Sequence, residues 1–168
     1  IVEKSPTPQS YVLLGDAYMA ITEPERALEV YEQALKRNPR DSVLAGKMGQ
    51  ALQKTHQYGK AINYYKEAIK GEENSSLRFD MAELQMKLKQ YDKAERSISQ
   101  ALEAESKNND LNALIMQAKF YTLLATVQER NNSLESAIRT LGNAKEIRSR
   151  ILKRVQIEQP DGIFEQRQ

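Results

Sequence analysis

The residue types that could carry catalysis or hold a metal are few and lie far apart in the chain. The single histidine, His56, lies in a predicted turn, and the absence of cysteine leaves it without obvious partners for a zinc site. Glu72 and Glu73 are adjacent carboxylates, but adjacent acids in a polar loop are usually only solvated. The seven glycines are scattered and form no phosphate-binding loop. We therefore expect no enzyme, no metal and no cofactor.

A basic segment near the C-terminus is the strongest charged feature. An exposed helical face near a helix C-terminus favours positive charge without any partner, so a specific acidic partner is the less favoured of two interpretations. Lys+Arg 25 nearly balance Asp+Glu 23 over the whole chain, which gives no electrostatic reason to expect nucleic acid. No apolar run is long enough to predict membrane insertion. The segment consists of Lys145, Arg148, Arg150, Lys153 and Arg154.

The N-terminal part of the chain carries the clearest structural pattern, that of two helices joined by a tight turn. Apolar and small residues at i, i+3, i+4 and i+7 predict a helix near 8–21, and the same spacing predicts a second helix near 25–37. Gly15 and Ala27 are small where these helices would cross, so the backbones can approach. Pro39 ends the second helix, because the residue before a proline is driven out of the α region.

The pattern returns in three looser copies, near 42–74, 75–107 and 110–159. Asp41 is a good N-cap for the second copy, and Gly71 is expected to stop its last helix as a C-cap glycine. Glu73 replaces the exit proline there, which predicts a less defined loop. In the third copy, Gln85 replaces the usual aromatic residue or leucine.

The fourth copy is extended. Its first helix is predicted from Asp110 to about Arg130, followed by a turn at 131–133 in which Ser133 is the N-cap. Its last helix is predicted to continue to about Gln159, where a Pro-Asp-Gly sequence breaks it. Residues 1–7 are expected to be a linker and residues 160–168 a frayed tail. The chain starts without methionine, and we expect it to be a piece of a longer protein.

This pattern closely resembles the tetratricopeptide repeat, whose period is about 34 residues. We predict an all-α solenoid of about four antiparallel helix pairs, wound as a right-handed superhelix over residues 8–159. Packing is the favoured explanation for the tyrosines at its core positions. The predicted core-signature residues are Tyr11, Leu14, Gly15, Tyr18, Ala27, Tyr31, Ala34, Pro39, Gly49, Ala61, Tyr65, Ala68, Ala82, Ala94, Ala101, Ala125, Ala137 and Ala144.

The resemblance implies a concave partner groove lined by the first helix of each repeat. Its apolar members could anchor a helix or an extended segment, or could simply pack against neighbouring helices; the sequence leaves both open. A chaperone-tail carboxylate clamp is not expected, because its five positions hold Val12, Asp16, Lys47, Ser76 and Asp80, of which two are acidic. The candidate groove residues are Val12, Asp16, Met19, Val43, Lys47, Gln50, Phe79, Glu83 and Met86.

Several stretches resemble the tetratricopeptide repeat protein 21 family in particular. They are SYVLLGDAY (10–18), ALEVYEQALKRNP (27–39), KTHQYGKAINYYKEAIK (54–70), KLKQYDKAE (87–95) and ILKRVQIEQPD (151–161), of which the last lies outside any repeat consensus. The resemblance implies a subunit of intraflagellar transport complex A, found in the cytoplasm and the cilium, at the axoneme and basal body. It also implies retrograde transport, cilium assembly, contacts with other subunits of that complex and no catalytic residues.

The resemblance thus favours a non-enzymatic protein–protein interaction scaffold of ciliary transport. The alternative is a generic peptide-binding repeat domain of another multiprotein complex. A third class, an enzyme or its regulatory part, depends on sequence outside this chain.

Overall fold

Eight α-helices make up the computed structural model, which describes residues 7–158, and no strand occurs in that range. The predicted tail 160–168, and the predicted linker 1–7 apart from Thr7, lie outside the described residues. The all-α class and the extended last pair agree with the prediction. The helices are α1 (Pro8–Ala20), α2 (Pro24–Arg37), α3 (Ser42–Lys54), α4 (Tyr58–Gly71), α5 (Ser75–Lys87), α6 (Tyr91–Glu105), α7 (Leu111–Arg130) and α8 (Leu134–Glu158).

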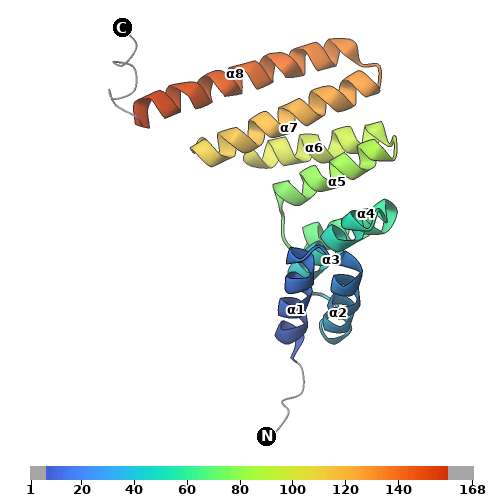
Figure 1. The fold of residues 1–168 in the computed structure, drawn as a ribbon. Helices are drawn as coiled ribbons and strands as arrows, with labels where there is room; N and C mark the ends of the chain where they lie inside the picture. The colour runs from blue at the N-terminus through green and yellow to red at the C-terminus, as the bar shows by residue number, and fades with distance from the viewer. Residues whose placement is uncertain (1–6, 159–168) are drawn as a thin grey trace, which may run out of the picture. The chain divides into compact units, whose positions relative to one another are not determined.

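The chain divides into two compact units, and the division falls between Lys89 and Gln90, inside the predicted third repeat. In the first unit α1 packs against α2, α2 against α3, α3 against α4, and α4 against α5 (Figure 1). In the second unit α6 packs against α7, and α7 packs against the long α8 (Figure 1). Such neighbour-to-neighbour packing is how a solenoid buries the apolar face that no single repeat can bury alone.

Side-chain caps start the first helix of every pair. Thr7, Asp41, Asn74 and Asp110 each accept a hydrogen bond from the backbone amide three residues ahead, at the start of α1, α3, α5 and α7. These caps satisfy amides that have no partner inside the helix. The predicted N-cap role of Asp41 is confirmed, with 3.0 Å from the Leu44 amide to its carboxylate.

The core of the first unit is built on two tyrosines. Tyr31 in α2 and Tyr65 in α4 are 2% and 0% exposed. A methyl group added to Gly15 or Gly49 would overlap the ring of Tyr31 or Tyr65, respectively. Each ring therefore lies directly against the glycine backbone of the helix before it. Alanines of the repeat pattern close the remaining space and are buried: Ala27, Ala34, Ala61, Ala68 and Ala82.

Among the core-signature residues predicted in α1, Leu14 is 44% exposed and lies outside the core. Tyr11 and Tyr18 are half-buried and pack against the core cluster of the first unit. These side chains belong to α1, and no described helix precedes α1 to cover its other side. Pro39 is exposed too, as suits a residue that only ends a helix.

Gly71 does not cap α4, contrary to the prediction. It is the last residue of the helix, and none of the described glycines has a positive φ. A methyl group on Gly71 would lie 2.5 Å from Cβ of Ser42, at the start of α3. The glycine is needed for the close approach of two helix ends, not for left-handed backbone. In the next loop Glu73, which stands where an exit proline is usual, forms an ion pair with Arg78, with 2.9 Å between Oε2 and Nη2.

The second unit keeps the alanine pattern but changes its register in α8. Ala94, Ala101, Ala125, Ala137 and Ala144 are all buried. In the other repeats the residue four places after the first alanine is buried (Tyr31, Tyr65 and Ile98). In α8 this residue is Leu141, which is 53% exposed. Thr140 is buried in its place and hydrogen-bonds Gln128 of α7. A polar contact therefore replaces the buried Tyr31, Tyr65 or Ile98 side chain of the earlier repeats.

Candidate partner-binding site

Asp16 and Lys47 form the centre of the predicted groove. The Lys47 Nζ lies 2.8 Å from Oδ1 and 3.0 Å from Oδ2 of Asp16, so α1 and α3 are joined by an ion pair. The hydroxyl of Tyr31 in α2 donates a hydrogen bond of 2.6 Å to the same Oδ1. Three helices thus meet at one carboxylate.

The two partners keep Asp16 ionised. Burial alone would raise the pKa of Asp16, but hydrogen bonds from Lys47 and Tyr31 and the charge of Lys47 lower it below the usual value. Burial raises the pKa of Tyr31 far above that of a free tyrosine, and the hydrogen bond and charge of Asp16 add to this. The tyrosine therefore stays a neutral donor and the aspartate a charged acceptor.

This ion pair uses two of the five positions of a carboxylate clamp, Asp16 and Lys47. Lys47 is the one basic residue among the five clamp positions, and its ammonium group is bound to Asp16. The remaining positions offer the apolar Val12, the small Ser76 and a second acid, Asp80. A terminal carboxylate of a ligand would have to displace Asp16 and then face Asp80, which is unfavourable.

The apolar candidates fall into three groups by exposure. Val43 is 61% exposed, and Val12, Met19 and Met86 are half-buried. Phe79 is 5% exposed and lies in the core, so it is not available as an anchor. For Phe79 the packing interpretation therefore holds. The sequence could not separate the two, because an apolar residue on the first helix of a repeat suits either.

Sequence reasoning missed an apolar cavity next to Val12. It has a volume of about 350 Å³, and Leu13 of α1 and Leu44 of α3 are in its lining. Leu13 is 70% exposed, an unusual environment for a leucine beside other apolar side chains. The cavity is large enough for one aliphatic or aromatic side chain of a partner. It is lined by Pro8, Gln9, Val12, Leu13, Ala34, Asn38, Asp41 and Leu44.

The polar candidates are less tightly held. Gln50 is exposed and Glu83 is half-exposed. The Tyr65 hydroxyl bonds Gln53 at 2.7 Å and not Gln50, although Gln50 follows Asp16 at the repeat distance. Burial first, and then the charges of Asp80 and Glu83, raise the pKa of Tyr65. The Asp16 arrangement is therefore not repeated around Tyr65.

The residues considered for catalysis have structural surroundings. His56 Nδ1 hydrogen-bonds the Tyr58 hydroxyl at 2.8 Å in an exposed turn, and Glu72 is exposed at the end of α4. Among residues 7–158, no group of three or more His, Cys, Asp or Glu side chains is placed to hold a metal ion. None of the described helices is long and apolar enough to cross a membrane.

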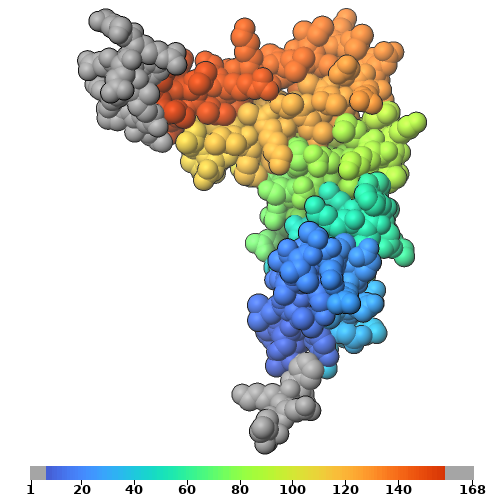
Figure 2. Space-filling model, viewed as in Figure 1, coloured from blue at the N-terminus to red at the C-terminus, as the bar shows by residue number. Residues whose placement is uncertain are grey.

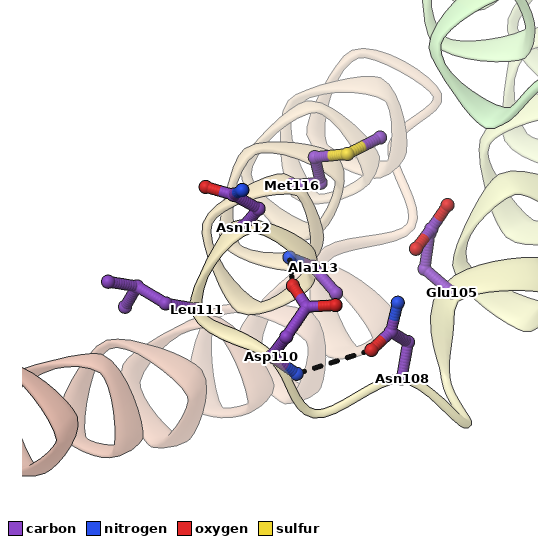
Figure 3. Close-up of a pocket in the computed structure, with 7 residues that line it drawn as sticks. All are labelled: Glu105, Asn108, Asp110, Leu111, Asn112, Ala113 and Met116. Atoms are coloured by element: carbon purple, nitrogen blue, oxygen red, sulfur yellow. Dashed lines mark hydrogen bonds between the residues drawn. The ribbon is translucent and has the colours of Figure 1, made fainter.

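A second cavity lies in the second unit, where α6 ends and α7 begins (Figure 3). Its volume is about 390 Å³, and its lining includes the acids Glu105 and Asp110. Asp110 uses one carboxylate oxygen to cap α7 through the Ala113 amide, and its own amide donates to Asn108 (Figure 3). These contacts explain Asn108 and Asp110 as parts of a helix start.

Comparison with known protein families gives two matches along the chain. Residues 8–41 match the family model of the tetratricopeptide repeat. Residues 44–168 match the model described as the tetratricopeptide repeat protein 21 forth ARM domain. Together the two models cover nearly the whole of the chain, and they confirm the repeat fold.

Curated relatives carry the same family name. Tetratricopeptide repeat protein 21B of Homo sapiens is 50% identical over 163 residues, which is 97% of this chain and 12% of the relative. Its counterpart in Xenopus laevis is 49% identical over 100% of this chain and 13% of the relative. The tetratricopeptide repeat protein 21 homolog of Caenorhabditis elegans is 34% identical over 86% of the chain and 11% of the relative. The chain thus spans only 11% to 13% of the length of these relatives.

Solved structures share the fold at low identity. MamA superposes with a TM-score of 0.76 at 17% identity, covering 88% of this chain and 82% of MamA. BtubC from P. vanneervenii gives 0.75 at 19% identity, covering 89% of this chain and 66% of that one. At this identity the likeness concerns the fold alone, an all-α helical-repeat solenoid.

Proposed function

Because the chain belongs to the tetratricopeptide repeat protein 21 family, we propose that it is a scaffold segment of intraflagellar transport complex A. Tetratricopeptide repeats are protein-interaction scaffolds, and this chain has their fold. The match of residues 44–168 to the family model is the observation that carries the proposal. In this role the segment acts in retrograde transport and cilium assembly, at the axoneme and basal body. Its partners are other subunits of the complex.

The first unit offers a defined surface for such a partner. Val12, Leu13 and Leu44 surround an apolar cavity, and the Asp16–Lys47 ion pair fixes α1 against α3 beside it. Because the ion pair and the buried Tyr31 already fix α1 and α3, the residues around the cavity lose little conformational freedom when a partner binds, which favours affinity. An apolar anchor inserted there would be bordered by charges that set its orientation.

A peptide-binding domain of another multiprotein complex is the alternative. The same cavity supports it, because one buried apolar side chain is what a short linear segment can supply. The two functions differ in the partner and not in the fold. Intraflagellar transport subunits captured from a lysate would favour the first, and capture of a short linear peptide alone would favour the second.

An affinity purification from ciliated cells tests the proposal. The chain is the bait, and the captured proteins are identified by mass spectrometry. The test variant combines Val12→Ala with Met86→Ala; Phe79 is left intact because it is buried and its truncation would destabilise the fold. Ile138→Ala is the matched control, since Ile138 is 69% exposed and belongs to α8 of the second unit.

We expect enrichment of intraflagellar transport subunits with the original chain and with the control, and a loss with the test variant. Enrichment that the test variant keeps would retain the scaffold function but move the contact away from Val12 and Met86 of the predicted groove. A lack of these subunits with all three baits would contradict the ciliary proposal for this segment. Circular dichroism at 222 nm verifies that each bait is folded.

A further inference from the structure

The C-terminal half of α8 places a group of cations beside an open cavity of about 370 Å³ in the second unit. Three of the lining residues are cationic and none is acidic, whereas the whole chain has a formal net charge of only +2. The lining of this cavity is therefore more positive than the chain as a whole. The cavity is lined by Asn109, Leu114, Arg150, Lys153, Arg154 and Ile157.

Two of these cations are fixed in place by the loop between α6 and α7. Nη2 of Arg150 donates to the side-chain oxygen of Asn109, and Nη2 of Arg154 donates to the Asn109 backbone carbonyl at 3.0 Å. A guanidinium group has five N–H donors, so each arginine keeps donors for a further acceptor. No carboxylate takes part in either contact, and the two positive charges are left uncompensated by Asn109.

Lys153 is the third cation and has no hydrogen-bond or ion-pair partner among the side chains described, those of residues 7–157. Its side chain and those of Arg150 and Arg154 border one cavity. Like charges placed together repel each other, and the arrangement gains energy when an anion binds among them. Arginine also forms paired hydrogen bonds with carboxylates, which lysine cannot do.

Aliphatic surface completes the cavity. Leu114 of α7 contributes to the lining although it is 2% exposed overall, while Ile157 of α8 is 75% exposed. In the view of Figure 2 much of the orange-to-red surface of α8 faces solvent. A short aliphatic side chain of a partner can therefore enter the cavity, and the cations then face the residues next to it in the partner's chain. The acid-lined cavity at Glu105 and Asp110 has the opposite charge character.

We propose that this cavity binds an acidic segment of a partner protein, in which one aliphatic side chain lies between carboxylates. The aliphatic group enters against Leu114 and Ile157, and the carboxylates pair with Arg150, Lys153 and Arg154. The inference rests on the scaffold function proposed above and adds the chemistry of one partner. It assigns a binding role to the three members of the basic segment that line the cavity, Arg150, Lys153 and Arg154, and leaves Lys145 and Arg148 to helix electrostatics alone.

Fluorescence polarisation with the purified chain tests this inference. The probe is a labelled peptide in which one leucine is flanked on each side by two glutamates, with glycine and serine elsewhere. At about 50 mM salt, where charges act over more than 10 Å, Lys153→Glu is expected to weaken binding by at least about fivefold. Lys145→Glu makes the same charge change on the same helix but outside the cavity, and a change below about twofold is expected.

Two altered peptides separate the contribution of the carboxylates to binding from that of the leucine side chain. Replacing the glutamates by glutamine, or the leucine by alanine, should each weaken binding to the original chain. Three outcomes would overturn the proposal. The glutamate peptide does not bind, or the glutamine peptide binds as tightly as the glutamate peptide, or Lys153→Glu and Lys145→Glu weaken binding by the same factor. Lys153-dependent binding to phosphatidylserine vesicles without binding to the peptide would overturn it as well. Because no transport subunit is used, failure here does not depend on the outcome of the affinity purification.

Discussion

Tyr31 of α2 occupies the space that a side chain on Gly15 of α1 would need, and Tyr65 of α4 has the same relation to Gly49 of α3. Each ring packs on a bare helix backbone and is almost fully buried. The hydroxyl of each tyrosine lies beyond the glycine and donates a hydrogen bond to a polar side chain of the first helix, Asp16 for Tyr31 and Gln53 for Tyr65. A single residue pair thus sets both the distance between two helices and the polar contact beside the predicted groove.

Gly49→Ala is predicted to destabilise the first unit. The added methyl group would lie 2.5 Å from Cε1 of Tyr65, whose ring is fully buried and cannot move without disturbing the core. Overpacking of this kind costs about 1–3 kcal/mol. Urea denaturation followed by circular dichroism at 222 nm measures the loss.

Gly59→Ala is the control for this substitution. Gly59 also lies in a helix, α4, but a methyl group there would meet nothing within 4 Å. Alanine in an exposed helix is favoured over glycine by about 0.5–1 kcal/mol, so this variant should be as stable as the original or more stable. Equal effects at Gly49 and Gly59 would refute the account of the tyrosine–glycine contact.

Gly71→Asn distinguishes two explanations of a helix-end glycine. If Gly71 had left-handed backbone, asparagine would be tolerated, because asparagine is the next residue to adopt that conformation. In the structure, however, a methyl carbon added to Gly71 would lie only 2.5 Å from Cβ of Ser42. We therefore expect a loss of at least about 1 kcal/mol.

A second substitution tests the cause of that loss. Ser42→Gly removes the Cβ that Gly71→Asn would meet, so the double variant should recover part of the stability after the separate cost of Ser42→Gly is subtracted. Thermal unfolding of all four proteins completes the cycle. Strict additivity of the two substitutions would mean that crowding at Ser42 is not the reason for the glycine.

The sequence predicts those parts of this fold that depend on local pattern. Helix spacing, the N-cap at Asp41 and the turn before α8 follow from residues close in the chain. Gly71 could not be assigned in this way, because a glycine at a helix end suits both a cap and a close approach, and only Ser42, far away in sequence, decides between them. The exposure of Leu14 likewise depends on which helices surround α1.

The candidate site was predictable only in outline. Its residues share one side of the first helices by repeat register, but the register gives Asp16 and Lys47 only as groove positions and does not decide whether they are in contact. Their ion pair depends on the offset between α1 and α3, which repeat spacing alone does not give. Phe79 is a second residue for which the repeat register is not enough. Its burial depends on the helices around it and not on its own position in the repeat.

Asp16→Asn is predicted to lower stability at neutral pH but not in acid. The pKa of Asp16 is held below its ordinary value of 3.8, so the charged form stabilises the fold above that pH and the contribution is lost as the pH falls through the lowered pKa. Asparagine keeps an acceptor for Tyr31 and removes only the charge. The side chains of Lys47 and Asp16 are 28% and 40% exposed, so solvent screening limits the difference to about 1 kcal/mol or less.

The free energy of unfolding, measured by urea at neutral pH and again at the lowest pH where the fold persists, tests this dependence. The difference between the original chain and Asp16→Asn should shrink towards acid. Glu67→Gln is the control, because the side chains of Glu67 and its ion-pair partner Lys70 are 65% and 75% exposed and should contribute almost nothing at either pH. A constant difference for Asp16→Asn at both values would rule out the ion pair as its source.

Thr140→Val is predicted to destabilise the second unit although it keeps the side-chain shape. Thr140 and Gln128 are 5% and 7% exposed, and the threonine hydroxyl donates to the Gln128 oxygen at 2.6 Å. Gln128 in turn donates to Glu95 of α6 at 2.9 Å, so one amide connects three helices. Valine leaves the buried amide oxygen without a donor, which costs about 1–3 kcal/mol.

Amide hydrogen exchange in α7 and α8 measures this loss within the second unit and does not require the whole chain to unfold in one step. Thr126→Val is the matched control: its hydroxyl bonds the Thr122 carbonyl of its own helix and no other helix, so the substitution should change protection little. In a Gln128→Leu background the amide oxygen is gone, and Thr140→Val should then cost much less. An unchanged cost in that background would show that valine acts through packing and that the hydrogen bond to Gln128 contributes nothing.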